Sequence, residues 1–422
     1  MEFCKSQYIP MQPKIISGGF ALENELSVRR TPIAYLNMRD PHVLKYYYKF
    51  KVLSLIEKED ISGSSPPDVF VGRYGYPNVY VGPLVPPVSG DTSELGLPET
   101  WAGKSIPEIV EARSMLVRGM QKEKVQNVDN SRIGSMLQEL AIADRFANVD
   151  MRLARKPNLM VKFDDNSQPF GPSAPMKMMR LGNTKANKQM EKAYFDTSLL
   201  ARDGMVELYS KGLEVSRIQK LLAAGGLGVK KSRKFVPTRW SITAVDDTLS
   251  KHNLEPVKES GPLEDVRVFS SVALDNRWLV LMFPGPWSYE LVEAWYPNTT
   301  WNMDSKEIYI FSSSEFFNGR KEYAEIGGCY YAARLAISEY LGKIGRQASA
   351  VVLRETHPGY IMPVGVWNVR EHVRETLRNE PVKFDTMRQA IDYIGTKMVI
   401  PIGTWMRNST VLRHLLNQRK LT

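Results

Sequence analysis

Four acidic residues in the second half of the chain have spacings that could support metal-dependent chemistry. Asp246 and Asp247 are adjacent, with His252 close by, and they could hold Mg²⁺ or Mn²⁺ for phosphodiester cleavage. Adjacent residues on a helix point about 100° apart, so capping or pairing with the basic residues upstream is the simpler interpretation. Glu290 and Glu293 are spaced as i and i+3, which would place both on one face of a helix. These four carboxylates are the candidate catalytic residues of a metal-dependent nuclease.

A predicted β-hairpin carries residues suited to nucleic acid. Residues 69–82 contain two β-rich runs joined by a turn of Gly, Pro and Asn. Arg73 in this turn could pair with a phosphate while Tyr74 or Tyr76 stacks on a base. The alternative interpretation is a structural hairpin with tyrosines on its surface.

A long basic stretch is the second candidate nucleic-acid site. The chain has 56 basic and 46 acidic residues and a net charge of +10, and residues 172–239 hold fourteen basic and five acidic residues, or +9. Concentrated positive charge attracts phosphate backbones by counterion release. Trp240, which follows this stretch, would either stack on a base or lie in the core. Five residues before it suit backbone contact: Lys230, Lys231, Arg233, Lys234 and Arg239. The alternative is a solvated basic face that acidic elements elsewhere balance.

The C-terminal residues indicate a protein partner. Gln418, with Leu421 three places later, matches the first half of a box that binds the sliding clamp (PCNA), the ring that encircles DNA. The two aromatic residues that normally complete this box do not follow. Residues 407–416 form a basic, helix-compatible segment that leads into it.

Composition limits the class of protein. A length of 422 residues predicts two or three domains, or one core with large insertions. With 43% hydrophobic and 24% charged residues and no run of 18 apolar residues, we expect a cytoplasmic, chromosome-associated protein without a membrane partner. Cys4 and Cys329 form neither a disulfide framework nor a CxxC pair, and the five histidines lack metal-ligand spacing. We therefore expect no zinc site and no certain cofactor.

The order of predicted elements indicates an α+β fold with mixed helices and β-sheet, a helical middle region and no internal repeats. Helices are predicted near residues 106–120 and 131–146, and strand-like runs include 348–353 and 361–367. We divide the chain into an N-terminal arm and helix, a domain with the hairpin, a basic helical region, a C-terminal α+β domain and a clamp-binding tail. Their bounds are 1–60, 61–170, 171–260, 261–405 and 406–422.

Four long blocks resemble the archaeal Nre DNA repair proteins. The blocks are residues 67–83, 234–247, 326–340 and 363–371, so the resemblance covers nearly the whole chain from about residue 60. It implies a role in the repair of DNA damage, and members of the family often end in a clamp-binding box. Some relatives carry an N-terminal element with four cysteines that binds zinc; this chain has only Cys4 there, so zinc is not carried over.

These observations predict a repair protein that binds DNA and docks on the sliding clamp through its tail. The metal-dependent nuclease is one alternative. Another is an RNA- or nucleotide-processing enzyme that uses the glycine-containing loops at residues 72–82 and 327–331.

Overall fold

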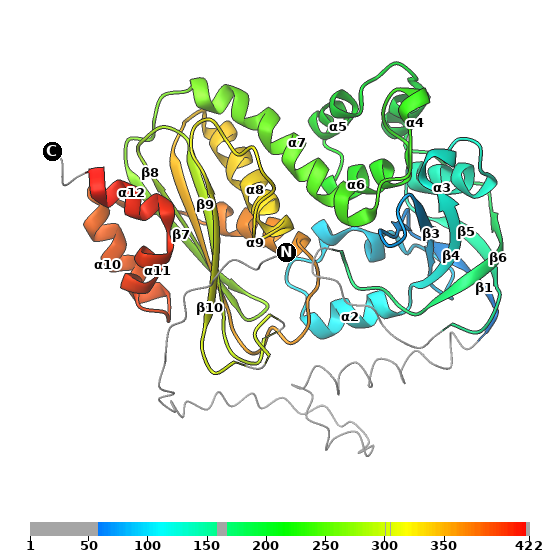
Figure 1. Cartoon of the computed structure of the whole chain (residues 1–422), viewed down its shortest axis with the longest axis horizontal. Coiled ribbons are helices and arrows are strands. Elements are labelled where there is room, and N and C mark those ends of the chain that lie inside the picture. Colours follow the sequence, from blue (N-terminus) through cyan, green and yellow to red (C-terminus); the bar gives the residue numbers. More distant parts are fainter. Residues whose placement is uncertain (1–57, 158–166, 300, 304, 419–422) are drawn as a thin grey trace, which may run out of the picture.

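A computed structural model describes residues 58–157, 167–299, 301–303 and 305–418, with side chains described as far as residue 415. It contains two six-stranded sheets with helices between and around them (Figure 1). The predicted α+β fold with a helical middle region is confirmed. Residues 1–57 of the predicted arm and helix, and Leu421 of the tail, lie outside the described residues.

The first sheet has the strand order β1-β5-β6-β4-β3-β2, in which only β4 and β6 run parallel. Strand β5 alternates residue by residue between buried and exposed positions, because successive side chains of a strand point to opposite faces. The buried face packs on α3 (Arg132–Ile142) and α6 (Val215–Ala223). The strands are β1 (Asp60–Ser65), β2 (Val69–Val71), β3 (Asn78–Val85), β4 (Val117–Lys124), β5 (Ala147–Leu153) and β6 (Ser173–Leu181). The predicted hairpin is β2 and β3.

The second sheet has the order β10-β9-β11-β8-β7-β12 and is covered on both faces. Helices α8 and α9 cover one face, and α10, α11 and α12 cover the other (Figure 1). The strands are β7 (Val266–Ala273), β8 (Asn276–Phe283), β9 (Ser288–Trp295), β10 (Tyr309–Glu315), β11 (Ser349–Thr356) and β12 (Val382–Phe384). The helices are α8 (Gly328–Ile344), α9 (Trp367–Arg378), α10 (Met387–Lys397), α11 (Ile402–Asn408) and α12 (Thr410–Gln418).

The middle region consists of α4 (Lys188–Phe195), α5 (Ala201–Ser210), α6 and the 22-residue helix α7 (Thr238–Glu259). Helix α7 runs between the two sheets, packing along α8 on one side and against α5 and α6 on the other (Figure 1). No helix in the described part of the chain is both long and apolar enough to cross a membrane.

Two predicted elements are wrong. The helix expected over 106–120 ends early: α2 (Ile106–Ser114) is followed at once by β4, because residues 117–124 pair with strands on both sides. Such long-range strand pairing is not visible in local periodicity. The strand expected over 361–367 is a loop that leads into α9, and Trp367 opens that helix.

A buried ionic cluster joins α7 to α9. The guanidinium of Arg370 on α9 lies 3.0 Å from Asp246 on α7 and 3.5 Å from Glu99. Gln219 on α6 donates a further hydrogen bond of 3.1 Å to Asp246. Burial raises the pKa of Asp246 to about 6, although the Arg370 charge opposes that rise. Because an unpaired buried charge is costly, these groups hold the segments together.

We expect Asp246→Ala to lower the free energy of unfolding by about 3 kcal/mol, since it leaves the buried Arg370 without one of its two closest partners. Urea denaturation followed by circular dichroism measures the change. Asp60→Ala is the matched control, because Asp60 pairs with Arg152 on the surface, where the two side chains are 65% and 57% exposed. This variant should leave the denaturation midpoint unchanged. Equal midpoints for the two variants would contradict a structural role for the buried cluster.

Candidate nucleic-acid interface

The turn of the hairpin presents its cation and rings to solvent. Arg73, Tyr74 and Tyr76 are all exposed, and Tyr74 keeps 79% of its surface accessible. The guanidinium of Arg73 lies 4.8 Å from the centre of the Tyr74 ring and donates a 3.1 Å hydrogen bond to its hydroxyl. Gly75 adopts a φ of 81°, a left-handed conformation that favours glycine and lets the chain reverse.

The first turn of α7 docks beside this hairpin. The Val71 amide donates a 2.9 Å hydrogen bond to the Thr238 hydroxyl, which fixes the start of α7 against the edge strand β2. Trp240 thereby meets Tyr76, with ring centres 5.2 Å apart and planes inclined by 52°. The rings remain 46% and 44% exposed. The structure thus brings together two segments that the sequence analysis selected separately.

Two further backbone hydrogen bonds connect the hairpin with the end of β4 and with the segment that precedes α7. The Val125 amide donates to the Pro77 carbonyl, and the Phe235 amide donates to the Val125 carbonyl, both at 2.9 Å. These bonds place the exposed Lys124 and Lys234, the residues that precede Val125 and Phe235, at the same end of the sheet.

The open face of the sheet adds residues that the sequence analysis missed. Tyr80 on β3 lies directly opposite Lys122 on β4, and Asn78 lies opposite Lys124, so these four exposed side chains share one face. In the described part of the chain, neither lysine has a carboxylate in salt-bridge range. Residues 117–124, Val-Arg-Gly-Met-Gln-Lys-Glu-Lys, do not alternate between apolar and polar residues, so no local signal indicated a strand there.

A buried arginine lies on the same face. Arg118 lies four residues before Lys122 on β4, so its side chain points to the same face of the sheet. Its guanidinium lies 4.3 Å from the centre of the Phe70 ring and donates a 2.8 Å hydrogen bond to the Tyr80 carbonyl. Burial lowers its pKa to about 9, so it stays charged at neutral pH. Its charge adds to the positive potential of this face.

The rest of the basic run is divided between surface and interior. Lys230 and Lys231 are exposed in a short 3₁₀ turn, and the Lys230 amide donates to the Thr197 carbonyl. Arg233 is buried: it donates to the carbonyls of Gly228 and Asp196 at 2.8 and 3.1 Å. Its guanidinium therefore holds this loop together. Arg239 is half-buried in the first turn of α7.

The +9 stretch does not form one surface. Arg217 is buried and donates to the carbonyls of Ala143 and Asp144. Lys220 is buried too and lies 3.5 Å from Asp68. Part of the charge counted in the sequence is therefore used inside the protein.

The adjacent carboxylates on α7 have separate partners. Asp246 belongs to the buried cluster with Arg370, and Asp247 pairs with Arg334 on α8 and with Lys251, which lies 2.8 Å away. The sequence predicts capping or pairing with the basic residues upstream. The observed partners come from α8, α9 and the next turn of α7 itself.

Glu290 and Glu293 lie on strand β9, so the prediction that they share a helix face is wrong. Residues i and i+3 of a strand point to opposite faces. Glu290 accepts hydrogen bonds from the amides of Thr410 and Val411 at 2.8 and 2.9 Å, and so caps the N-terminus of α12. Burial raises the pKa of Glu290, and these hydrogen bonds oppose the rise. Glu293 pairs at 2.7 Å with Arg354 on β11.

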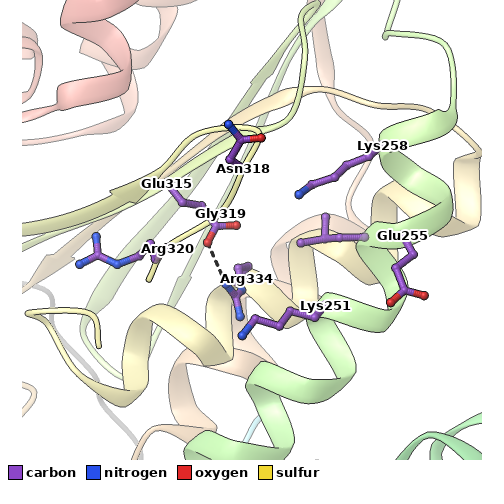
Figure 2. A pocket seen from close by; sticks show the side chains of 9 residues that line it. Lys251, Glu255, Lys258, Glu315, Asn318, Gly319, Arg320 and Arg334 are labelled. Carbon is purple, nitrogen blue, oxygen red and sulfur yellow. Dashed lines mark hydrogen bonds and ion pairs between the residues drawn. The ribbon is translucent and has the colours of Figure 1, made fainter. Parts of the chain in front are cut away.

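A small charged cavity lies between the C-terminal half of α7 and the end of β10 (Figure 2). Its volume is about 180 Å³, and its walls include Lys251, Lys258, Glu315 and Arg334. Arg334 points to Glu315, with 2.8 Å between their charged atoms, so these two charges of the cavity wall balance each other. Among the residues that the structure describes, no three His, Cys, Asp or Glu side chains gather as a metal site.

Comparison with known proteins identifies the family. A model described as archaeal Nre, N-terminal, matches residues 39–302, and one described as archaeal Nre, C-terminal, matches residues 315–422. The chain belongs to the archaeal Nre family. It is 43% identical over 357 residues to the DNA repair protein NreB of Archaeoglobus fulgidus, covering 84% of this chain and 90% of the relative.

Two other relatives are similar. The DNA repair protein NreA of Haloferax volcanii is 34% identical over 367 residues, covering 84% of this chain and 87% of the relative. NreA of Archaeoglobus fulgidus is 35% identical over 346 residues, covering 81% of this chain and 87% of the relative. No solved structure matches the chain.

The division of the basic run can be tested by stability. Arg233→Ala should lower the free energy of unfolding by about 2 kcal/mol, because two carbonyl groups lose a charged donor. Lys234→Ala, at the exposed neighbouring position, should change it by no more than about 0.5 kcal/mol. Chemical denaturation measures both values. A loss for Lys234→Ala as large as that for Arg233→Ala would show that the assignment is wrong.

Proposed function

We propose that the chain acts in DNA repair by binding DNA at the interface formed by the hairpin and the start of α7. The observation that carries this proposal is the contact of Tyr76 with Trp240 beside exposed cations. The relatives described above are named DNA repair proteins, which supports the same role.

The chemistry of this interface suits a polyanion. Arg73 lies in the hairpin turn with Tyr74 and Tyr76, Lys234 precedes the Phe235 that bonds to Val125, and Lys122 and Lys124 lie on the exposed face of the adjoining strand β4. Exposed ammonium groups without carboxylate partners can replace the counterions of a phosphate backbone. The exposed aromatic rings add contact area to this electrostatic attraction.

Docking on the sliding clamp through Gln418 and Leu421 is a second part of the proposal. Gln418 is the last residue of α12, and Glu290 holds the first turn of that helix on the second sheet. The segment would thus leave the protein from a fixed point, available to a partner. Binding to DNA and to its clamp would also place the protein on the chromosome.

The enzyme alternatives lack a comparable observation. Each of Asp246, Asp247, Glu290 and Glu293 is engaged by basic side chains or backbone amides of the protein itself. We therefore propose binding, and not cleavage, as the function of the described surface.

DNA affinity should fall steeply between about 50 and 200 mM salt if lysines contact phosphates. Replacing Lys122 and Lys124 together by Ala should lower the slope of log affinity against log salt by about 1 for each phosphate that a lysine no longer neutralises. Fluorescence anisotropy with a labelled oligonucleotide measures the slope. The control is Lys321→Ala with Lys397→Ala, which removes the same charge from exposed positions in the C-terminal half. If the Lys122 and Lys124 double variant has the same salt slope as the control variant, the DNA binds at another surface.

Clamp binding should depend on the tail. Gln418→Ala combined with Leu421→Ala should weaken binding to the cognate clamp at least about tenfold, because these two side chains would fill the pocket. Calorimetry with the purified ring measures the affinity. Lys420→Ala, between the two positions, is the control and should bind like the parent chain. Unchanged affinity of the double variant would reject this docking mode.

A further inference from the structure

We infer that the interface of the hairpin with α7 recognises unpaired DNA bases, so that its substrates are single strands, flaps or bubbles and not intact duplex. This inference rests on the proposed function and specifies the DNA structure that the surface takes.

Four exposed aromatic residues lie at this site. Tyr74, Tyr76, Tyr80 and Trp240 are exposed by 79%, 44%, 45% and 46%. A large ring in water forgoes the free energy of burial, so a cluster of such rings marks a binding surface. The Tyr76 and Trp240 rings are tilted by 52°, so neither covers the other as in a parallel stack. Each can therefore offer ring surface to a flat ligand.

The rings are held by rigid elements. The hydrogen bond from Val71 to Thr238 fixes α7 against β2, and the bond from Val125 to Pro77 fixes the end of the hairpin. Tyr80 lies on a strand and Trp240 in the first turn of a helix, and elements of this kind keep their geometry better than a free loop; Tyr76 lies in the hairpin turn, which these bonds anchor. The aromatic surface is thus preorganised.

Duplex DNA does not offer what these rings bind. In a double helix the faces of the bases are stacked on one another, and proteins reach only the base edges in the grooves. A single strand exposes base faces, and proteins that bind it combine stacking rings with a basic track for the backbone. Lys122 and Lys124 are two residues apart on one strand face, about 6.8 Å, and form such a track beside Tyr80.

A groove-binding role for α7 is less compatible with its surroundings. A recognition helix must leave one long face free to enter the major groove. Helix α7 is instead packed on α8, α6 and α5, and only its first turn reaches the hairpin. The residues of the hairpin turn and of the first turn of α7 would therefore contact the DNA, and the rest of the helix would not.

The test compares three DNAs by fluorescence anisotropy: a single strand, the blunt duplex of the same sequence, and that duplex with a central bubble. The parent chain should bind the single strand and the bubble at least about tenfold more tightly than the duplex. Trp240→Ala and Tyr76→Ala should each weaken single-strand binding by about 5- to 140-fold, the range for removal of one stacked base, with an unchanged salt slope. Trp240→Phe should restore most of the affinity.

The matched control is Trp301→Ala, because Trp301 is similarly exposed, at 51%, but lies in the C-terminal half of the chain. It should bind all three DNAs as the parent chain does. Thermal melting of every variant separates a binding defect from a folding defect. Duplex binding as tight as single-strand binding, with no effect of Trp240→Ala, would overturn this inference and leave DNA binding intact. Absence of binding to all three DNAs would overturn the proposed function itself.

Discussion

The buried pair of Asp246 and Arg370 fixes where α7 lies, and the arrangement of the two sheets depends on that helix. Arg370 also reaches Glu99, which belongs to the first half of the chain, and Glu371 beside it on α9. One guanidinium is thus shared by three carboxylates from separate segments. Removing charges from water is costly unless they are paired and hydrogen-bonded, so this cluster tolerates only one relative position of its segments. The neighbouring pair of Asp247 with Arg334 holds α7 to α8 in the same way.

Helix α7 carries this constraint to the surface. Its centre is held by the ionic cluster, while its first turn docks on β2 through Thr238. The position of Trp240 against Tyr76 therefore follows from interactions made deep in the molecule. A binding surface built in this way gains precision from the scaffold, because the rings need little ordering when a ligand arrives. The hairpin alone, with its exposed turn, would not provide a second ring at a fixed distance.

Several buried carboxylates in the described part of the chain serve as internal partners for cations and helix ends. Glu290 shows the principle most clearly, since its carboxylate reaches from the second sheet to the amides that begin α12. The charge interacts favourably with the helix dipole and satisfies donors that would otherwise be unpaired. Glu293 and Arg354 similarly cross-link β9 and β11. In a sequence, such carboxylates resemble catalytic groups. Their spacing does not show which cations or amides of the folded protein bind their oxygens.

The sequence by itself determined the elements whose signals are local. It predicted the hairpin from its turn residues, the α+β class from the mixture of patterns, and the family from four long blocks. It also indicated both segments of the proposed interface, because charge and aromatic content are readable residue by residue. Tertiary structure alone decided that Tyr76 meets Trp240, that Arg233 is internal, and that residues 117–124 form a strand. These outcomes depend on partners distant in the chain: strand pairing, burial and ion pairing are settled by which surfaces pack together, and local sequence does not specify those surfaces.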